Sequence, residues 1–290
     1  MKKRISCTLI LILLLVLLFP ATASADMGPK PSVRITFTGA EGLTWYGTLL
    51  SFYDSTGPSS AWDGREENAY TGEEDDGREI WEAFVAYEDT DGYYFLQEWW
   101  DCTESHSLNW TYYPPSPFKV LLYFPVSGEY RVSPIYERYA FDSYYTIDLA
   151  GATSGGLALE KSYGFGGELV SLLARILFTI LAELCIAWLF GYREKGLLRL
   201  LAIVNLCTQI LLNVLLNIIN YTGGSLLFVL CFVLFELVVF AIEAILYGIL
   251  IPRRSTKPTG KGKAVLYAFV ANAASFALGL AIAHWIPGIF

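Results

Sequence analysis

Four ionisable residues lie inside long apolar segments near the C-terminus, where a charge is costly. They are Arg175, Glu183, Glu236 and Glu243. Ionisable residues at membrane depth carry protons or ions in some proteins. In others they belong to an internal network, in which a protonated Glu hydrogen-bonds to Asn or Gln and an Arg pairs with an acid. The sequence leaves open an ion or proton path, a polar ligand cavity and such a network, and we favour the network.

Amide side chains recur at helical spacing beside these residues. Asn205, Gln209 and Asn213 fall on one face of the second apolar segment, because a helix turns by about 100° per residue. Glu236 and Glu243 are seven residues apart and share a face of the third segment. A polar face turned toward lipid is costly, so we expect these faces to turn inward. The predicted polar network comprises Arg175, Glu183, Asn205, Gln209, Asn213, Glu236, Glu243 and Asn272.

A second candidate site is aromatic. Exposed aromatic rings bind sugars and proline-rich peptides, whereas buried rings fill the core of a small domain. We expect most of the rings in the core and one exposed aromatic surface for a ligand. The residues of this candidate binding surface are Trp99, Trp100, Trp110, Tyr112 and Tyr113.

The acidic segment Asp89–Gly92 resembles part of a calcium-binding loop, because Glu98 follows six residues after the glycine. The first loop position, however, would be Tyr87, where such loops place a carboxylate ligand. We therefore interpret the segment as a tight Asp-Gly hairpin turn. With His106 and His284 as the two histidines, a zinc site is hard to build. The sequence predicts no metal, no cofactor and no catalytic residue, although an enzyme that uses a membrane-embedded Glu stays open.

Acidic and basic residues are unevenly distributed along the chain. Residues 26–165 contain 23 Asp and Glu against 8 Lys and Arg, a net charge of −15, whereas residues 166–290 contain 5 against 9, a net charge of +4. The acidic half argues against a nucleic-acid partner, because phosphate contacts need clustered basic residues. Cys102 is the one cysteine between residues 26 and 165, so we expect no disulfide bond there.

The side of the membrane on which the aromatic site lies depends on whether the N-terminal part of the chain is exported. Residues 1–25 read as a signal peptide, with a basic start, an apolar run and small residues before the cleavage site. The pattern of residues 26–148 predicts an extracytoplasmic all-β domain that resembles a sandwich, with a prealbumin-like or immunoglobulin-like topology. A short helix is expected over Arg78–Tyr87. The expected strands are Val33–Phe37, Thr44–Phe52, Gly92–Trp100, Phe118–Phe124 and Tyr144–Asp148.

The remainder of the chain predicts a membrane domain. Residues 149–167 are rich in small residues and read as a linker. Residues 168–290 contain four apolar segments, each long enough to cross a bilayer, which predicts a four-helix transmembrane bundle.

The charges of the loops predict the orientation of the helices in the membrane independently of the signal peptide. The loops 192–196 and 252–263, with Arg199, contain eight Lys and Arg, whereas the turn 220–225 and the tail 287–290 contain none. This asymmetry follows the positive-inside rule if the basic loops are cytoplasmic. We predict a multi-pass plasma-membrane protein whose N-terminal domain and C-terminus are extracytoplasmic.

These features together favour a non-enzymatic protein of the bacterial cell envelope. Its expected partners are the lipid bilayer and, for the exported domain, an envelope protein, a peptide or a glycan. The alternative is a small transporter or channel that uses the intramembrane Glu, Asn and Gln residues.

The chain also resembles a group of uncharacterised bacterial membrane proteins. The resemblance implies a secreted aromatic-rich β domain followed by C-terminal transmembrane helices, and it implies no activity. It is carried by Trp45–Ser51, Asp91–Gln97, Pro114–Lys119, Leu121–Pro125 and Glu137–Tyr144.

Overall fold

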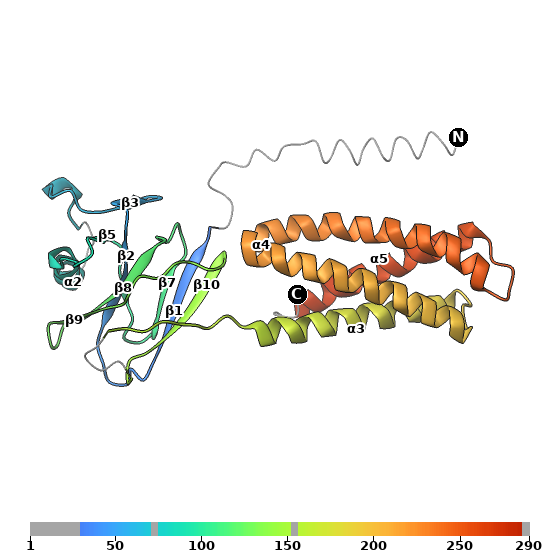
Figure 1. Cartoon of the computed structure of the whole chain (residues 1–290), viewed down its shortest axis with the longest axis horizontal. Coiled ribbons are helices and arrows are strands. Elements are labelled where there is room, and N and C mark those ends of the chain that lie inside the picture. Colours follow the sequence, from blue (N-terminus) through green and yellow to red (C-terminus); the bar gives the residue numbers. More distant parts are fainter. Residues whose placement is uncertain (1–29, 71–74, 152–155, 286–290) are drawn as a thin grey trace.

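The computed structural model of the chain describes residues 30–70, 75–151 and 156–285. A β-sheet region comes first and four helical segments follow, so the architecture is a mixture of α and β (Figure 1). The predicted signal peptide, residues 1–25, lies outside the described residues.

The first sheet has four strands, in the order β11 (Glu160–Lys161), β10 (Asp142–Asp148), β1 (Ser32–Thr38) and β7 (Ser107–Trp110). Strand β1 runs parallel to β10 and antiparallel to β7. Along β1, Val33, Ile35 and Phe37 are buried while Arg34 and Thr36 between them are exposed. This period of two is expected for a strand with one covered face.

The second sheet has the order β5 (Tyr94–Phe95), β2 (Tyr46–Ser51), β8 (Phe118–Phe124) and β9 (Glu129–Val132), and β6 (Trp100–Asp101) also pairs with β2. A short ribbon of β3 (Ser55–Thr56) and β4 (Ser59–Ser60) follows β2. Strand β8 is buried along almost its whole length. Both faces of β8 are therefore covered by other parts of the protein, whereas only one face of β1 is covered.

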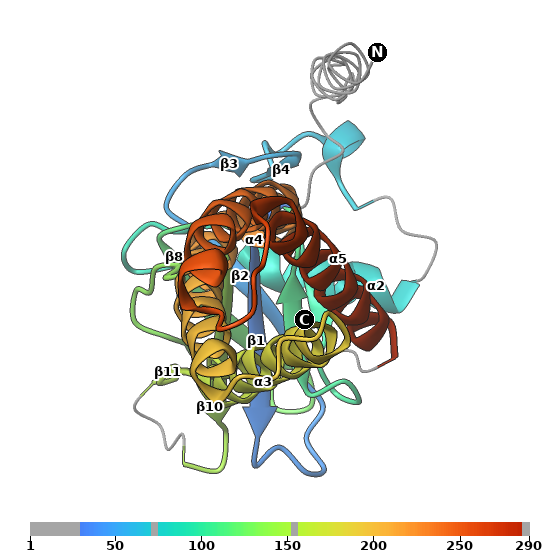
Figure 2. The same cartoon turned by 90° about the vertical axis from the view of Figure 1, so that its right-hand side faces the viewer.

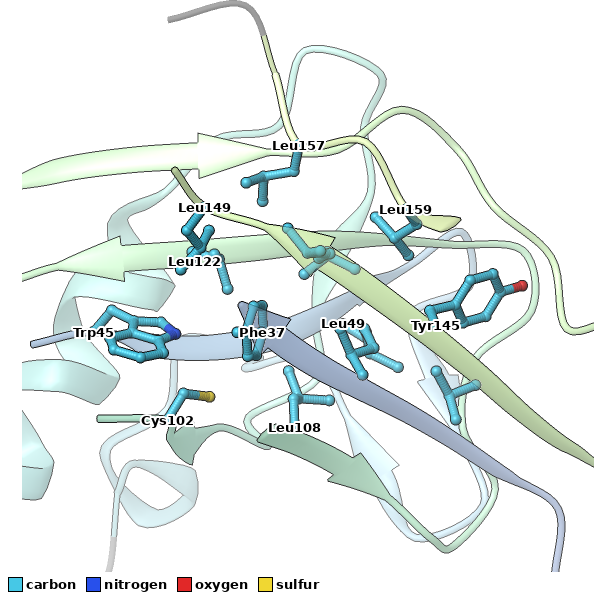
Figure 3. Packing of buried hydrophobic residues seen from close by; sticks show 14 of the residues in the cluster. Phe37, Trp45, Leu49, Cys102, Leu108, Leu122, Tyr145, Leu149, Leu157 and Leu159 are labelled. Atoms are coloured by element: carbon cyan, nitrogen blue, oxygen red, sulfur yellow. The ribbon is translucent and has the colours of Figure 1, made fainter. Parts of the chain in front are cut away.

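The two sheets face each other across a hydrophobic core (Figure 3). Each principal strand contributes a large side chain to this core, for example Phe37, Leu49, Leu108, Leu122 and Tyr145. The core thus joins strands that lie far apart in the sequence.

Helix α2 (Asp75–Ala86) covers the other face of the second sheet. Its side chains Trp81 and Phe84 pack in one cluster with Leu50 of β2 and Leu121 of β8. The amphipathic helix expected from the sequence is therefore confirmed, and it accounts for the double cover of β8.

The structure differs from the sequence prediction in three places. The strand expected over residues 92–100 is reduced to β5 and β6, because Gln97 between them has a φ of 63°, which a continuous strand does not allow. Strands β3, β4, β7 and β9 were not predicted. Strand β11 and the buried side chains of Leu157 and Leu159 fall inside the segment 149–167, which composition alone assigns to a linker.

Residues 27–162 should fold without the helices and without a disulfide bond. Cys102 is a free, fully buried thiol, and burial raises its pKa to about 12. We expect one cooperative thermal melt that reductant does not change, and no maleimide labelling of Cys102 at pH 8 until the fragment unfolds. A fragment ending at residue 150 should be less stable by about 1.5–3 kcal/mol for each buried leucine removed, Leu157 and Leu159. Absence of a cooperative melt in either buffer contradicts the prediction.

The helices are α3 (Phe165–Leu189), α4 (Lys195–Arg254) and α5 (Lys261–Trp285). Helix α4 is interrupted at Gly224, whose φ of 77° divides it into two limbs that run in opposite directions (Figure 1). Viewed from the end of the molecule, α3, both limbs of α4 and α5 lie side by side (Figure 2). Within the described chain, α3 and α4 are long and apolar enough to cross a membrane.

The turn between the limbs of α4 touches the β-sheet region. The backbone N–H of Phe141 donates to the carbonyl oxygen of Tyr221 at 2.9 Å, and the rings of Tyr139 and Tyr163 contact the Tyr221 ring. A side chain at position 224 would overlap the Phe141 ring. Glycine is therefore required there both for the left-handed backbone and for the close approach.

Candidate functional sites

Glu243 is the most completely buried acid of the helical region. Its Oε1 accepts a hydrogen bond from the Thr208 hydroxyl at 2.6 Å, and its Oε2 accepts one from the Asn272 amide at 2.9 Å. The two limbs of α4 and helix α5 thus meet at one carboxyl group. Thr208 was not among the residues predicted from the sequence, because a Thr in an apolar helix also bonds its own backbone and gives no separate signal.

Glu183 on α3 and Asn205 on α4 form the second polar group. Both side chains are buried, being 2% and 1% exposed, and they are neighbours. Neither oxygen of Glu183 and neither polar atom of the Asn205 amide has a hydrogen-bond partner of good geometry within the described part of the chain. Unsatisfied buried polar atoms cost about 1–3 kcal/mol each, so a proton shared between the Glu183 carboxyl and the neighbouring Asn205 amide would stabilise the pair.

Glu236 lies two helical turns from Glu243, toward Gly224, along the same limb of α4 and lines a small polar cavity with Arg175, Gln209 and Asn213. The cavity has a volume of about 20 Å³, which holds a single water molecule. The Asn213 amide donates to the Gln209 side-chain oxygen at 3.3 Å. Glu236 is only half-buried, in contrast to the other two acids.

The eight residues of the predicted polar network therefore gather in three adjoining groups, and Thr208 joins two of them by its contacts with Glu243 and with the Asn205 backbone. Glu243 meets Asn272, Glu183 meets Asn205, and Glu236 shares a cavity with Arg175, Gln209 and Asn213. Seven of the eight side chains are buried, and Glu236 is the exception.

The five aromatic residues expected to form a binding surface do not share one surface. Trp110 is 2% exposed and belongs to the core between the sheets, where Trp100 packs on it. Trp99 directly precedes β6 and packs against Tyr46 in the cluster between the second sheet and α2. Tyr112 and Tyr113 are exposed at about a third of their area.

A different group of aromatic side chains lines a cavity with a volume of about 1050 Å³. We call it the aromatic groove. The Trp62 and Trp81 rings meet edge to face at 5.4 Å, and Tyr70 stands beside Trp81. The lining residues are Asp54, Ser55, Ser60, Ala61, Trp62, Asp63, Asn68, Ala69, Tyr70, Trp81, Tyr94 and Gln97.

A short 3₁₀ helix, η1 (Glu66–Asn68), holds one wall of the aromatic groove in place. Asp63 accepts hydrogen bonds from the backbone N–H of Arg65 and from the Asn68 amide, and the Trp62 indole N–H donates to the Arg65 carbonyl oxygen. The Arg65 N–H bond is the main cause that lowers the pKa of Asp63, so its carboxylate stays ionised. The wall combines an indole with a fixed negative charge.

No sequence pattern indicated the aromatic groove. Its rings come from the loop after β4, from α2 and from β5. The contacts between these segments are set by tertiary packing, so no periodicity could have grouped them.

The Asp89–Gly92 turn binds a lysine. The Lys119 Nζ lies 2.9 Å from both carboxylate oxygens of Asp89 and also contacts Asp91. The backbone N–H of Gly92 donates to the Asp89 carbonyl oxygen, as in a tight turn. The turn predicted from the sequence is present, but it joins α2 to β5 and is not a hairpin, and its acids face an internal cation.

No protein-family model, curated protein or solved structure matches this chain. Its function therefore follows from the chemistry of the aromatic groove and of the buried acids.

Proposed function

We propose that this chain is an integral membrane protein of the bacterial cell envelope that binds a glycan or peptide outside the plasma membrane. The β-sheet region is the binding module and the four helical segments span the bilayer. The aromatic groove is the observation that carries the proposal.

The lining of the aromatic groove suits a polar ligand with apolar faces. Trp62 and Tyr94 are 36% and 47% exposed, so part of each ring is available for stacking. Asp54, Asn68 and Gln97 place carboxylate and amide groups on the same walls, and a few such polar groups among aromatic side chains fix the orientation of a ligand. Sugars and short peptides combine the two kinds of surface.

The exposed surface of the helices supports the membrane placement. Leu177, Leu211, Leu230 and Ile245 are between 56% and 63% exposed. Apolar surface of this extent on a soluble protein would lead to aggregation, whereas lipid covers it in a bilayer.

Binding by the full-length chain in detergent micelles tests the groove. We expect a glycan or peptide from a panel of envelope components to bind, and we expect Trp62→Ala to weaken that binding about tenfold, which equals about 1.4 kcal/mol. Tyr112→Ala, an exposed aromatic residue outside the groove, is the matched control. A Trp62→Ala variant that binds as well as the wild type would sink the assignment.

Cysteine labelling in intact cells tests the topology. In a background without the native cysteines, Lys257→Cys should stay unlabelled by an impermeant maleimide, because it lies in the basic loop assigned to the cytoplasm. Glu129→Cys, on the β-sheet region, should label fully. External labelling at position 257 contradicts the proposed orientation.

Transport of a proton or small cation is a second candidate function. The observation that favours it is the group of Glu183 and Asn205, whose buried side chains are neighbours without a hydrogen bond of good geometry within the described chain. A scaffold network would pair these atoms, whereas a transport site alternates between loaded and unloaded states.

A further inference from the structure

Glu236 stands between two cavities of opposite character. On one side is the small polar cavity that it shares with Arg175. On the other side is a groove of about 270 Å³ between the second limb of α4 and α5, which we call the lateral groove. These two elements lie side by side in both views (Figures 1 and 2). The lateral groove is lined by Val233, Glu236, Leu237, Phe240, Phe269, Asn272, Ala273 and Phe276.

The lateral groove opens on the outer surface of the helices. Leu237 and Phe269 on its rim are 50% and 56% exposed. In the membrane placement proposed above, on which this inference rests, a solute would enter from the lipid and not from water.

The walls of the lateral groove are apolar and aromatic. The rings of Phe240 and Phe269 meet edge to face at 5.5 Å, and Phe276 stacks on Phe232 at 5.7 Å. These contacts fix the rings and leave a preformed slot for an apolar body. A slot of this kind needs little rearrangement to accept a ligand.

Glu236 places a carboxyl group on the wall of the lateral groove. No hydrogen bond or ion pair to Glu236 occurs within the described part of the chain, and none of the lining residues is basic. Glu243, by contrast, has a donor on each oxygen. A lone carboxylate at membrane depth is costly unless a cation approaches it.

We propose that the lateral groove binds a lipophilic organic cation, a quaternary ammonium or phosphonium group carried on an apolar body. Glu236 is its counter-ion, and the phenylalanine rings contact both the apolar body and, through their π faces, the cation. A neutral acyl chain would satisfy the walls and leave the carboxylate unpaired. An inorganic cation would pair with the carboxylate, but the slot offers it a single side-chain amide, Asn272, as a further oxygen ligand.

Equilibrium binding of radiolabelled tetraphenylphosphonium to the full-length chain in detergent tests the proposal. We expect saturable binding, at least a tenfold loss in Glu236→Gln, and substantial retention in Glu236→Asp, which keeps the charge. Phe269→Ala should weaken binding severalfold, while its control Leu266→Ala, an exposed residue of α5 outside the groove, should not. Glu194→Gln, in the loop before α4, controls for loss of an acid elsewhere. Size-exclusion profiles check that each variant is folded.

Competition separates the alternatives. Dodecyltrimethylammonium should displace the probe, whereas dodecanol and Na⁺ should not. Displacement by dodecanol, or normal binding in Glu236→Gln, would reduce the groove to a nonspecific apolar slot and overturn the proposal, and so would the absence of saturable binding. None of these outcomes alters the result at the aromatic groove or the cysteine labelling, so a failure here is distinct from a failure of the proposed function.

Discussion

Replacing Lys119 by methionine should destabilise the β-sheet region by about 3–5 kcal/mol. The side chains of Lys119 and Asp89 are 4% and 0% exposed, and they are joined by two hydrogen bonds of 2.9 Å. Methionine fills similar space but removes the ammonium, which leaves the Asp89 carboxylate buried without its cation. That uncompensated charge causes most of the loss. The Tyr93 ring, 5.1 Å from the ammonium, adds a smaller cation–π contribution.

Urea denaturation of the fragment 27–162 measures this effect. Lys161→Met is the matched control, since Lys161 is exposed and its loss should change stability by no more than about 1 kcal/mol, the size of an exposed cation–π contact such as the one it makes with Tyr139. Adding Asp89→Asn to Lys119→Met should recover part of the loss, because the buried charge is then gone. Equal unfolding midpoints for Lys119→Met and the wild type would contradict the assignment.

The same ion group predicts a loss of stability in alkali. Burial alone would lower the pKa of Lys119, but the hydrogen bonds to Asp91 and Asp89 outweigh it and hold the pKa above the usual 10.5. The stabilisation is therefore complete below pH 10.5 and is lost as the pH rises through the raised pKa. Burial also raises the pKa of Tyr145, which acts in the same direction. The difference between the wild type and Lys119→Met should thus shrink above pH 10.5.

The spacing of apolar residues predicted those strands and helices that bury a single face. Strand β1 and helix α2 were found from their periods, because each covers one layer of the core. The role of Lys119 was not found, although its place in an apolar strand is unusual. In β8, Val120 and Leu122 face the core between the sheets, whereas Lys119 and Leu121 face the other side. Only the packing of α2 and the following turn brings Asp89 to Lys119.

The candidate sites divide in the same way. Helical spacing was enough to place Glu243 and Asn205 on inward faces, because lipid penalises the alternative. Spacing does not show how far each side chain is enclosed, and Glu236 is reached from the outer surface through the lateral groove. The aromatic groove depends on contacts between Trp62 and Trp81, which come from different elements, and these contacts follow from the tertiary fold alone.

Glu243→Gln should leave the full-length protein folded, whereas Glu243→Leu should destabilise it by about 1–3 kcal/mol. Glutamine keeps an oxygen that accepts the hydrogen bond from the Asn272 amide. Its new NH₂ group can donate to the Thr208 hydroxyl, which can turn its own proton to the Asn205 carbonyl oxygen 3.0 Å away. Leucine offers no acceptor, so a buried amide proton and a hydroxyl lose their shared partner. Thermal unfolding in detergent measures the two variants against Leu266→Ala, a control at an exposed residue of α5.

The same pair of variants decides between scaffold and carrier. If the buried acids only hold the helices together, Glu243→Gln keeps every property of the wild type, because the hydrogen bonds remain. If they carry a proton or cation, Glu243→Gln abolishes uptake into proteoliposomes without loss of folded protein, since an amide neither binds nor releases the charge. The transport candidate therefore requires uptake by the wild type and none by the folded Gln variant. Equal uptake by the two proteins removes Glu243 from the transport path. No uptake by the wild type rules the transport candidate out and leaves extracytoplasmic binding as the function.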